Sequence, residues 1–185
     1  MSKLFWRYGA MGAGKSVALL SVAHNYARIG RKVDLFTASL DERFGAGKVA
    51  SRLGISMDAR TFTPATVFTR EMMADDAACV LVDEAQFLTA VQVEQLHRLA
   101  ALGGLPVICY GLRSDFMGRA FEGAAALGIL ADQIEELKTV CACGRKATFN
   151  MRLDGAGQRV REGAQVQIGG DETYRQTCPV CFYGA

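Results

Sequence analysis

The sequence lacks any apolar run long enough to cross a membrane, and it carries almost no excess of charge of either sign. Its 21 Lys and Arg against 19 Asp and Glu leave a formal net charge of +2, so the charge balance gives no general case for binding nucleic acid or a membrane surface. Its two histidines, His24 and His97, have no partner at metal-ligand spacing. Internal repeats and low-complexity tracts are also absent. A membrane-spanning protein, a repeat protein and a histidine metal site are therefore excluded.

What the chain does contain is enough apolar material for a well-packed domain. Half of its 185 residues are hydrophobic and 22% are charged, which is typical of a globular protein rather than a disordered one. This length is sufficient for one domain and a small appendage.

A phosphate-binding pattern lies close to the N-terminus. Eight consecutive residues match G-x-x-x-x-G-K-[ST] at every fixed position: Gly9, Ala10, Met11, Gly12, Ala13, Gly14, Lys15 and Ser16. A strand-like segment precedes them and an apolar, helix-compatible segment follows, so backbone N–H groups and a helix N-terminus converge on one point. We expect Lys15 to reach the β- and γ-phosphates and the Ser16 hydroxyl to ligate Mg²⁺. A glycine-rich turn without a ligand is the alternative, but it does not require this order of strand, loop and helix.

The position of this pattern also bears on localisation. The residues before it comprise one lysine and a short strand-like run, so a cleaved signal would remove the phosphate site. We therefore expect a cytoplasmic protein.

The chain alternates apolar segments, predicted as strands, with segments predicted as helices. The predicted strands are 4–8, 33–38, 79–82 and 105–110. The predicted helices are one continuing through 17–23, one over 64–74 with Thr63 as N-cap, one over 89–102 opened by Thr89, and one over 118–127. The glycine-bearing stretch 41–48 is predicted as a loop. Apolar strands alternating with helices indicate a parallel sheet covered on both faces, as in an α/β P-loop NTPase of the RecA-like class.

Three polar segments follow predicted strands directly: 9–16, 83–86 and 111–116. Ligands of such sheets bind beyond the carboxyl ends of the strands, so we expect these three segments to meet there.

Asp83 and Glu84 end an apolar strand in the manner of a Walker B pair. Asp83 is placed to hold Mg²⁺ opposite Ser16. Glu84 should point elsewhere and is able to accept a proton from an attacking hydroxyl or water. Gln86 and Phe87 offer a hydrogen-bonding group and a flat apolar wall to a second ligand. The alternative is a helix-capping or solvated acidic pair.

The six cysteines fall into two groups. Cys79 and Cys109 lie inside apolar runs and are interpreted as small buried hydrophobic residues. The other four are Cys141, Cys143, Cys178 and Cys181. Their C-x-C and C-x₂-C pairs predict a closed, structural zinc site, in preference to free thiols, disulfides or a nucleic-acid-binding finger, which would need a basic surface. We expect residues 1–137 to form the nucleotide-binding domain and 138–185 a β-rich zinc module.

The combined motifs resemble the type II thymidine kinases, the zinc-containing class of bacteria, some viruses and animal cytosol. The resemblance extends over essentially the whole chain. It rests on 9–16, 41–48, 82–87, 110–116, the four cysteines and 168–174 in this order and spacing.

This resemblance implies an ATP-dependent kinase that makes thymidine 5′-monophosphate, with Mg²⁺ and structural Zn²⁺ as cofactors. It implies that Glu84 is the general base and that Asp83, Ser16 and Arg43 serve Mg²⁺ and the phosphates, with Gln86 in the same set. The implied nucleoside pocket comprises Met11, Phe87, Leu112, Phe116, Phe121, Ile168, Gly169, Gly170 and Tyr174. The zinc-clamped loop, the lasso of this family, would close over the base.

The resemblance further implies a homotetramer inhibited by thymidine triphosphate. Two departures from the family pattern are visible. Ala85 replaces a residue that is often cysteine in bacterial members, and the chain stops four residues after Cys181, so we expect no C-terminal regulatory tail.

Two other functional classes compete with a kinase. A recombinase- or helicase-like ATPase motor would use the zinc module to hold nucleic acid, and the charge balance argues against it. A regulatory nucleotide-binding protein without turnover would not need Glu84 beside Asp83. The glycine- and charge-rich stretch 154–167 is predicted to be mobile without ligand and to order as a lid over the nucleoside.

Overall fold

A six-stranded parallel sheet forms the centre of the computed structural model, which describes residues 2–41, 45, 47–167 and 173–184. Its strand order is β5-β2-β6-β7-β1-β8. The strands are β1 (Leu4–Tyr8), β2 (Lys32–Ala38), β5 (Arg60–Phe62), β6 (Ala77–Val82), β7 (Val107–Gly111) and β8 (Gln133–Glu136). The strands predicted at 4–8, 33–38, 79–82 and 105–110 are confirmed, with ends that differ by up to two residues. β5 and β8 were not predicted.

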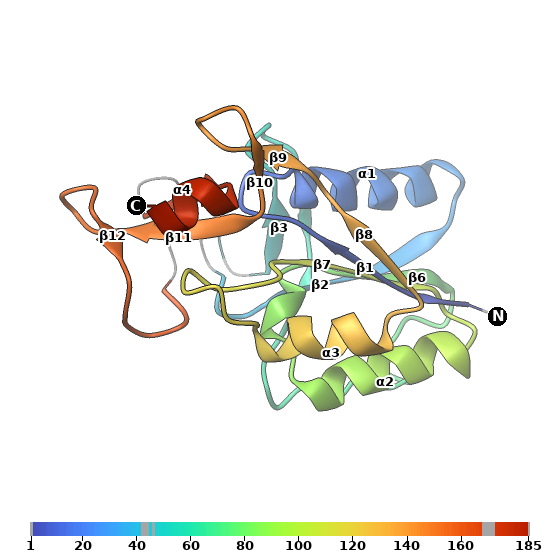
Figure 1. Ribbon diagram of the computed structural model, residues 1–185. Helices are drawn as coiled ribbons and strands as arrows, with labels where there is room; N and C mark the ends of the chain where they lie inside the picture. Colours follow the sequence, from blue (N-terminus) through green and yellow to red (C-terminus); the bar gives the residue numbers. More distant parts are fainter. Residues whose placement is uncertain (1, 42–44, 46, 168–172, 185) are drawn as a thin grey trace.

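Helices cover both faces of this sheet, as the apolar strands predicted. α1 (Lys15–Arg28) lies on one face, and α2 (Ala90–Ala101) and α3 (Glu122–Leu130) lie on the other (Figure 1). Successive residues of β6 alternate between the two cores: Val80 packs on the side of α2 and α3, whereas Leu81 packs on the side of α1. Such burial on both faces explains why the strand sequence is continuously apolar.

α2 begins where its sequence predicts. The Thr89 side chain accepts a hydrogen bond from the Gln92 N–H, and the Gln92 side chain accepts one from the Thr89 N–H, which completes a capping box.

α3 begins four residues later than the predicted 118–127. The carboxylate of Asp115 accepts hydrogen bonds from the N–H groups of Met117 and Arg119 at 2.9 and 2.8 Å. Since these donors are held in a tight loop by a nearby side chain, the helix starts only after Phe121.

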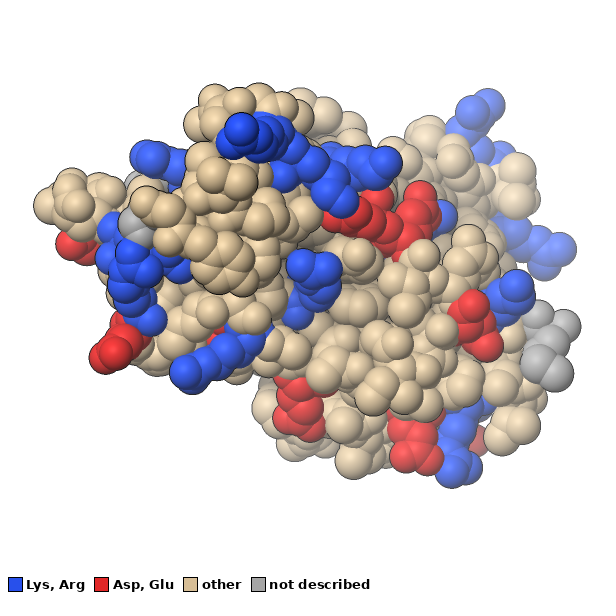
Figure 2. Space-filling model, in the orientation of Figure 1, with Lys and Arg blue, Asp and Glu red and all other residues tan. Residues whose placement is uncertain are grey.

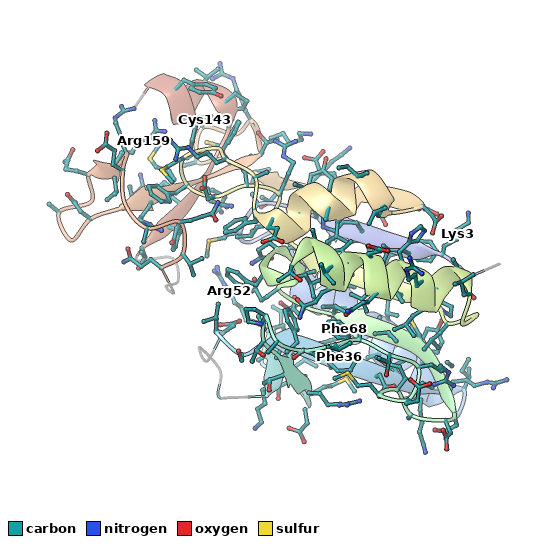
Figure 3. The ribbon with its side chains drawn as sticks, turned by 90° about the horizontal axis from the view of Figure 1, so that it is seen from below. Lys3, Phe36, Arg52, Phe68, Cys143 and Arg159 are labelled. Carbon is teal, nitrogen blue, oxygen red and sulfur yellow. The ribbon has the colours of Figure 1, made fainter. Side chains whose placement is uncertain are left out.

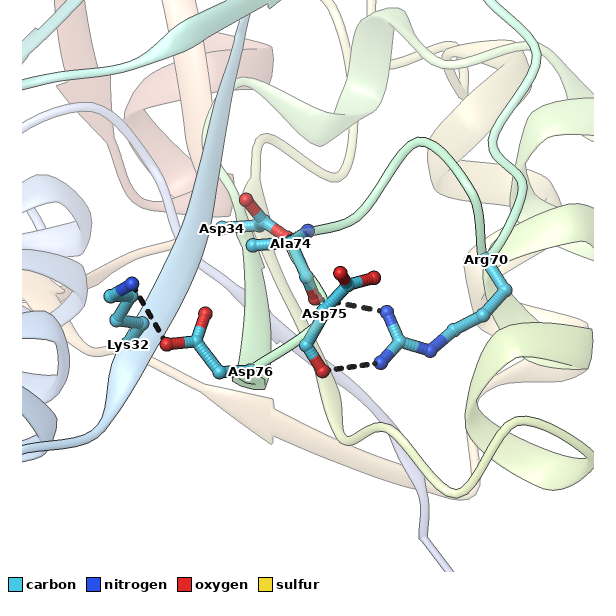
Figure 4. Close-up of polar contacts among 6 residues, drawn as sticks. All are labelled: Lys32, Asp34, Arg70, Ala74, Asp75 and Asp76. Atoms are coloured by element: carbon cyan, nitrogen blue, oxygen red, sulfur yellow. Dashed lines mark hydrogen bonds and ion pairs between the residues drawn. The ribbon is translucent and has the colours of Figure 1, made fainter.

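The predicted helix over 64–74 is wrong, because side chains from distant segments and from within the turn bond to its backbone groups. The Gln92 amide donates to the carbonyls of Thr63 and Thr66 at 2.7 and 2.8 Å. Arg70 donates to the carbonyls of Ala74 and Asp75, both at 3.0 Å. Figure 4 shows this turn beside β2, where the Asp34 carboxylate accepts from the Ala74 N–H and Lys32 pairs with Asp76.

The same irregular segment also contributes to the core. Phe68 is buried against Phe36 of β2, with ring centroids 5.3 Å apart in an edge-to-face arrangement (Figure 3). The segment thus buries one aromatic ring from an irregular backbone instead of the apolar face of a helix. Helix propensity, which depends on local residues, does not predict this packing.

We expect Gln92→Leu to lower the free energy of unfolding by about 2 kcal/mol or more, because the carbonyls of Thr63 and Thr66 and the Thr89 N–H lose the buried Gln92 amide as their partner. Urea unfolding measures this change. Val91→Ala on the same helix, at a side chain that is 62% exposed, is the matched control and should shift stability by no more than about 0.5 kcal/mol. Equal stability of the two variants would show that Gln92 does not hold the segment.

The predicted loop over 41–48 leads into a small hairpin that was not predicted. β3 (Lys48–Ala50) and β4 (Ser56–Asp58) pair in antiparallel fashion. Residues 42–44 and 46 lie outside the described part of the chain.

The C-terminal part is small and rich in strands, as predicted. β9 (Thr139–Val140) pairs with β10 (Lys146–Ala147), and β11 (Phe149–Leu153) lies between β12 (Arg159–Val160) and β13 (Tyr174–Thr177). α4 (Pro179–Gly184) closes the module, which lies beside the carboxyl ends of the main sheet (Figure 1). Among the described residues, no helix is both long enough and apolar enough to span a bilayer.

Candidate active site and metal centre

The three segments predicted to converge do meet at the carboxyl edge of the sheet. The Gly9 N–H donates to the Gly111 carbonyl at 3.3 Å, and the Ser16 hydroxyl donates to the Asp83 carboxylate at 3.2 Å. Together they border a cavity of about 560 Å³, which is within the size range of small-molecule sites. Arg52, from the turn between β3 and β4, borders the same cavity (Figure 3).

The phosphate loop has the geometry that its glycines predict. Gly12 and Gly14 have φ values of 74° and 76°, in the left-handed region that favours glycine, and Gly14 is the N-cap of α1. The Lys15 ammonium folds back onto the carbonyls of Gly9 and Ala10, at 3.1 and 3.0 Å. A phosphate over this loop would therefore meet the N-terminus of α1 and a cation already positioned beside it.

Asp83 is a buried carboxylate beside a hydroxyl donor. Burial and the neighbouring Glu84 raise the pKa of the Asp83 carboxyl to about 7. A cation beside this group would favour its charged form. Because the Ser16 and Asp83 oxygens are hard ligands only 3.2 Å apart, these residues fit Mg²⁺.

Glu84 has an unusual backbone conformation. Its φ is 52°, and it is the non-glycine residue with positive φ among those that the structure describes. Such strain costs about 1–3 kcal/mol and is typical of functional sites. Its carboxylate accepts a 2.5 Å hydrogen bond from the Gln86 amide, whose oxygen in turn accepts the Leu112 N–H at 2.9 Å.

The short helix η1 (Ala85–Phe87) that follows Glu84 is held by close backbone packing. Gly123 of α3 lies against it so closely that a Cβ there would be 2.6 Å from the Ala85 carbonyl oxygen. A glycine at this position lets α3 support the turn that carries Glu84.

Apolar side chains from separate parts of the chain border the other part of the cavity. These residues are Met11, Phe87, Leu112, Phe116, Phe121 and Tyr174. The rings of Phe87 and Phe121 are 5.8 Å apart in an edge-to-face arrangement. The remaining predicted site residues, Arg43, Ile168, Gly169 and Gly170, lie outside the described residues.

The sequence did not indicate three polar residues at or beside this cavity: Asn150 and Gln165 border it, and Arg152 contacts Phe116 and Tyr174, which border it. Asn150 and Arg152 alternate with apolar residues on β11, a pattern that usually indicates a solvated strand face, yet both are buried. Gln165, from the C-terminal loop, donates to the Asp115 carboxylate at 3.0 Å. No motif signals these residues, because their partners lie far away in the sequence.

The structure divides the predicted lid over 154–167 into two parts. Its first part is a hairpin turn in which the Asp154 carboxylate accepts from the N–H groups of Ala156 and Gln158. Arg159 of β12 stacks over the Phe182 ring at 4.2 Å and donates to the Phe182 carbonyl. Residues 164–167 follow and reach the cavity, where Gln165, Val166 and Gln167 border it.

The four predicted zinc ligands lie together in the C-terminal module. The Sγ atoms of Cys141, Cys143, Cys178 and Cys181 all lie within 4.8 Å of one another, and those of Cys143 and Cys178 are 3.6 Å apart. A tetrahedral zinc with bonds of about 2.3 Å has sulfur atoms about 3.8 Å apart, so the cluster fits a four-thiolate centre. The Cys181 N–H points at the Cys178 sulfur at 3.5 Å, which further supports a thiolate there.

Comparison with known proteins agrees with this geometry. A family model described as "Thymidine kinase" matches residues 2–182. A thymidine kinase of Albidiferax ferrireducens is 55% identical over 183 residues, which cover 99% of this chain and 93% of that protein. One of Chromobacterium violaceum is 52% identical, with 99% of both chains covered, and one of Haemophilus influenzae is 48% identical, with 96% of this chain and 94% of that protein covered.

Proposed function

The chain belongs to the thymidine kinase family, and from this premise we propose that it transfers the γ-phosphoryl group of ATP to the 5′-hydroxyl of thymidine. The observation that carries the proposal is a single cavity bordered both by the phosphate loop and by an apolar pocket, with Glu84 lining it as well. ATP and thymidine would meet there, and the products would be ADP and thymidine 5′-monophosphate.

In the proposed reaction, the nucleoside 5′-oxygen forms a bond to the γ-phosphorus while the bond from that phosphorus to the β,γ-bridging oxygen breaks. The hydroxyl proton passes to the Glu84 carboxylate, and ADP leaves with the bond electrons. Gln86 holds Glu84 in place through its 2.5 Å hydrogen bond. We therefore assign Gln86 to the positioning of the base, in addition to its predicted place in the ATP and Mg²⁺ set.

The phosphate loop would stabilise the negative charge of the phosphates. Lys15 and the backbone N–H groups at the start of α1 bind and orient them. Ser16 and Asp83 would hold Mg²⁺, with Arg43 assisting, and the ion when bound neutralises charge on the transferred group.

The nucleoside would occupy the apolar part of the cavity. A flat, neutral pyrimidine suits walls formed by Phe87, Phe116 and Phe121, because such walls bury the ring and leave its edges for hydrogen bonds. Met11, Leu112 and Tyr174 complete the described part of this pocket, and Ile168 to Gly170 would add backbone contacts.

The wider setting follows from the family. We propose the domain boundary at 137/138, since β8 ends in the main sheet at Glu136 and β9 begins in the module at Thr139. We also propose structural zinc, a homotetramer and inhibition by thymidine triphosphate. A cytoplasmic location is supported by the need to keep four zinc-binding thiols reduced.

A nucleic-acid-dependent motor is disfavoured by the surface. Figure 2 shows acidic and basic side chains interspersed on this face, rather than one continuous basic stripe. The direct test measures ATP consumption with a panel of nucleosides and with single-stranded DNA. Turnover with thymidine and its absence with DNA are expected; stimulation by DNA alone would overturn the proposal.

The exposed loop over 161–167 provides a further prediction. Thymidine beneath this loop should protect it from limited proteolysis far better than adenosine does, because the pyrimidine fits the apolar walls below the loop and adds to the contacts that Arg152 and Tyr174 make with it. Mass spectrometry locates the cut, and cleavage at Arg31, an exposed residue beyond α1, is the internal control. Equal cutting of 161–167 with and without thymidine would mean that this loop is not the lid.

A further inference from the structure

The C-terminal module makes direct contact with the first half of the phosphate loop. The Asn150 side-chain oxygen accepts a hydrogen bond from the Met11 N–H at 2.8 Å, across 139 positions of sequence. Gln176 of β13 lies beside Gly12, where an added Cβ would be 3.5 Å from its side chain. The Thr139 hydroxyl lies 3.5 Å from the Gly12 carbonyl. Three strands of the module therefore border the same two loop residues.

Arg152, two positions further along β11, holds the loop over the cavity. Its guanidinium donates to the carbonyls of Ala164 and Gln165 at 2.9 and 3.3 Å and to the Tyr174 hydroxyl at 3.0 Å. The Tyr174 hydroxyl donates in turn to the Gln167 carbonyl at 2.7 Å. A buried arginine with these acceptors fixes the path of residues 164–167.

Arg152 also contacts the wall of the apolar pocket. Its guanidinium carbon lies 3.7 Å from the centre of the Phe116 ring, a short cation–π contact. A change in the position of the Phe116 ring or of residues 164–167 would therefore alter the contacts of the Arg152 side chain.

Asn150 and Arg152 are linked by the geometry of their strand. Residues two positions apart on a strand point to the same face, and both side chains are at most 5% exposed. β11 is held on both sides by pairing with β12 and β13, so it is a stiff element rather than a loop. Figure 1 shows it beside the connection from β1 to α1.

We infer that Asn150 is a positioning residue that couples closure over the nucleoside to the conformation of the phosphate loop. Closure of residues 164–167 fixes the Arg152 side chain, the stiff strand β11 joins Arg152 to Asn150, and Asn150 holds Met11. Met11 belongs to both ligand sites, since it lies in the phosphate loop and borders the apolar pocket. Binding of the nucleoside and of ATP is therefore cooperative, and the inference rests on the proposed function.

The test measures the affinity for thymidine with and without a non-hydrolysable ATP analogue, by calorimetry on the full chain. The unaltered protein should bind thymidine about 5-fold or more tightly when the analogue is present, a coupling of ordinary size. Asn150→Ala should reduce this factor to about 2-fold or less while both ligands still bind. Arg152→Lys should do the same, because lysine cannot reproduce the forked donors.

Two further variants separate coupling from general damage. Asn150→Asp retains an acceptor for the Met11 N–H, so it should keep the coupling factor even if its charge weakens ATP binding. Arg175→Ala, at an exposed position of the neighbouring β13, should change nothing.

The outcomes distinguish this inference from the proposed function. Failure of the unaltered protein to bind either ligand would contradict the proposed function itself. Three results would overturn the inference alone. The unaltered protein could bind both ligands without coupling, Asn150→Ala and Arg152→Lys could both leave the coupling factor unchanged, or Asn150→Asp could lose the coupling. Thermal unfolding identifies a variant that fails to fold. If either Asn150→Ala or Arg152→Lys fails to fold, the coupling factor of the other variant tests the inference.

Discussion

Glu84→Gln is expected to lower kcat by about 10²-fold or more while the affinity for ATP barely changes. Glutamine keeps the size of the side chain and a hydrogen-bonding oxygen, but it cannot accept the proton of the nucleoside hydroxyl. The positive φ of Glu84 and the hydrogen bond from Gln86 orient this side chain. A glutamine at position 84 keeps an oxygen that can accept the Gln86 bond, so the orientation does not depend on the negative charge alone.

Steady-state kinetics with thymidine and ATP, together with equilibrium binding of an ATP analogue, separates the two effects. Glu94→Gln is the matched control, since Glu94 is an exposed residue of α2 that pairs with Arg98. It should leave kcat within about twofold of the unaltered protein. Turnover close to normal in Glu84→Gln would reject Glu84 as the base.

Cys178→Ser is expected to abolish the binding of one zinc ion per chain and to weaken nucleoside binding before ATP binding. Zinc contributes about 10 kcal/mol or more to small modules of this kind, and this module has few buried apolar residues to replace it. Its loss would release β11 and β13, which carry the contacts to residues 164–167 and Tyr174. The N-terminal sheet and most of the phosphate loop would remain folded.

Elemental analysis gives the zinc content, and calorimetry gives the two affinities. Cys79→Ala is the control, because Cys79 is buried in the main sheet far from the four-cysteine cluster in sequence and is expected to leave the zinc content at one per chain. Unaltered protein without zinc, prepared in the absence of chelators, would contradict a structural site. So would a metal that exchanges on addition of thymidine.

Features that depend on local chemistry could be predicted from the sequence. The phosphate loop needs glycines at positive φ and a lysine at one spacing, and these residues impose that geometry wherever they follow a strand. Thr89 and Gln92 cap α2 through backbone groups three residues away. The paired cysteines also indicate a metal site locally, because the C-x-C and C-x₂-C spacings hold the two thiols of each pair close together.

Other features could not be predicted because their partners are distant in the chain. Residues 64–74 have a helix-compatible sequence, but the distant side chains of Gln92 and Asp34 bond to backbone groups that a helix would use. A hydrogen bond from a distant side chain competes directly with a local one of similar energy, so propensity alone cannot decide between them.

The sequence by itself determined the α/β class, the phosphate loop, the acidic pair at the end of β6 and the four cysteines. Only the tertiary structure decided that Gln86 accepts from the Leu112 N–H, that Asn150 holds Met11, and that Arg152 joins Phe116 to residues 164–167. The reason is physical: a motif encodes groups that act on neighbouring atoms of the same segment. Contacts between the C-terminal module and the main sheet exist only once both have folded and their buried polar groups must find partners across the interface.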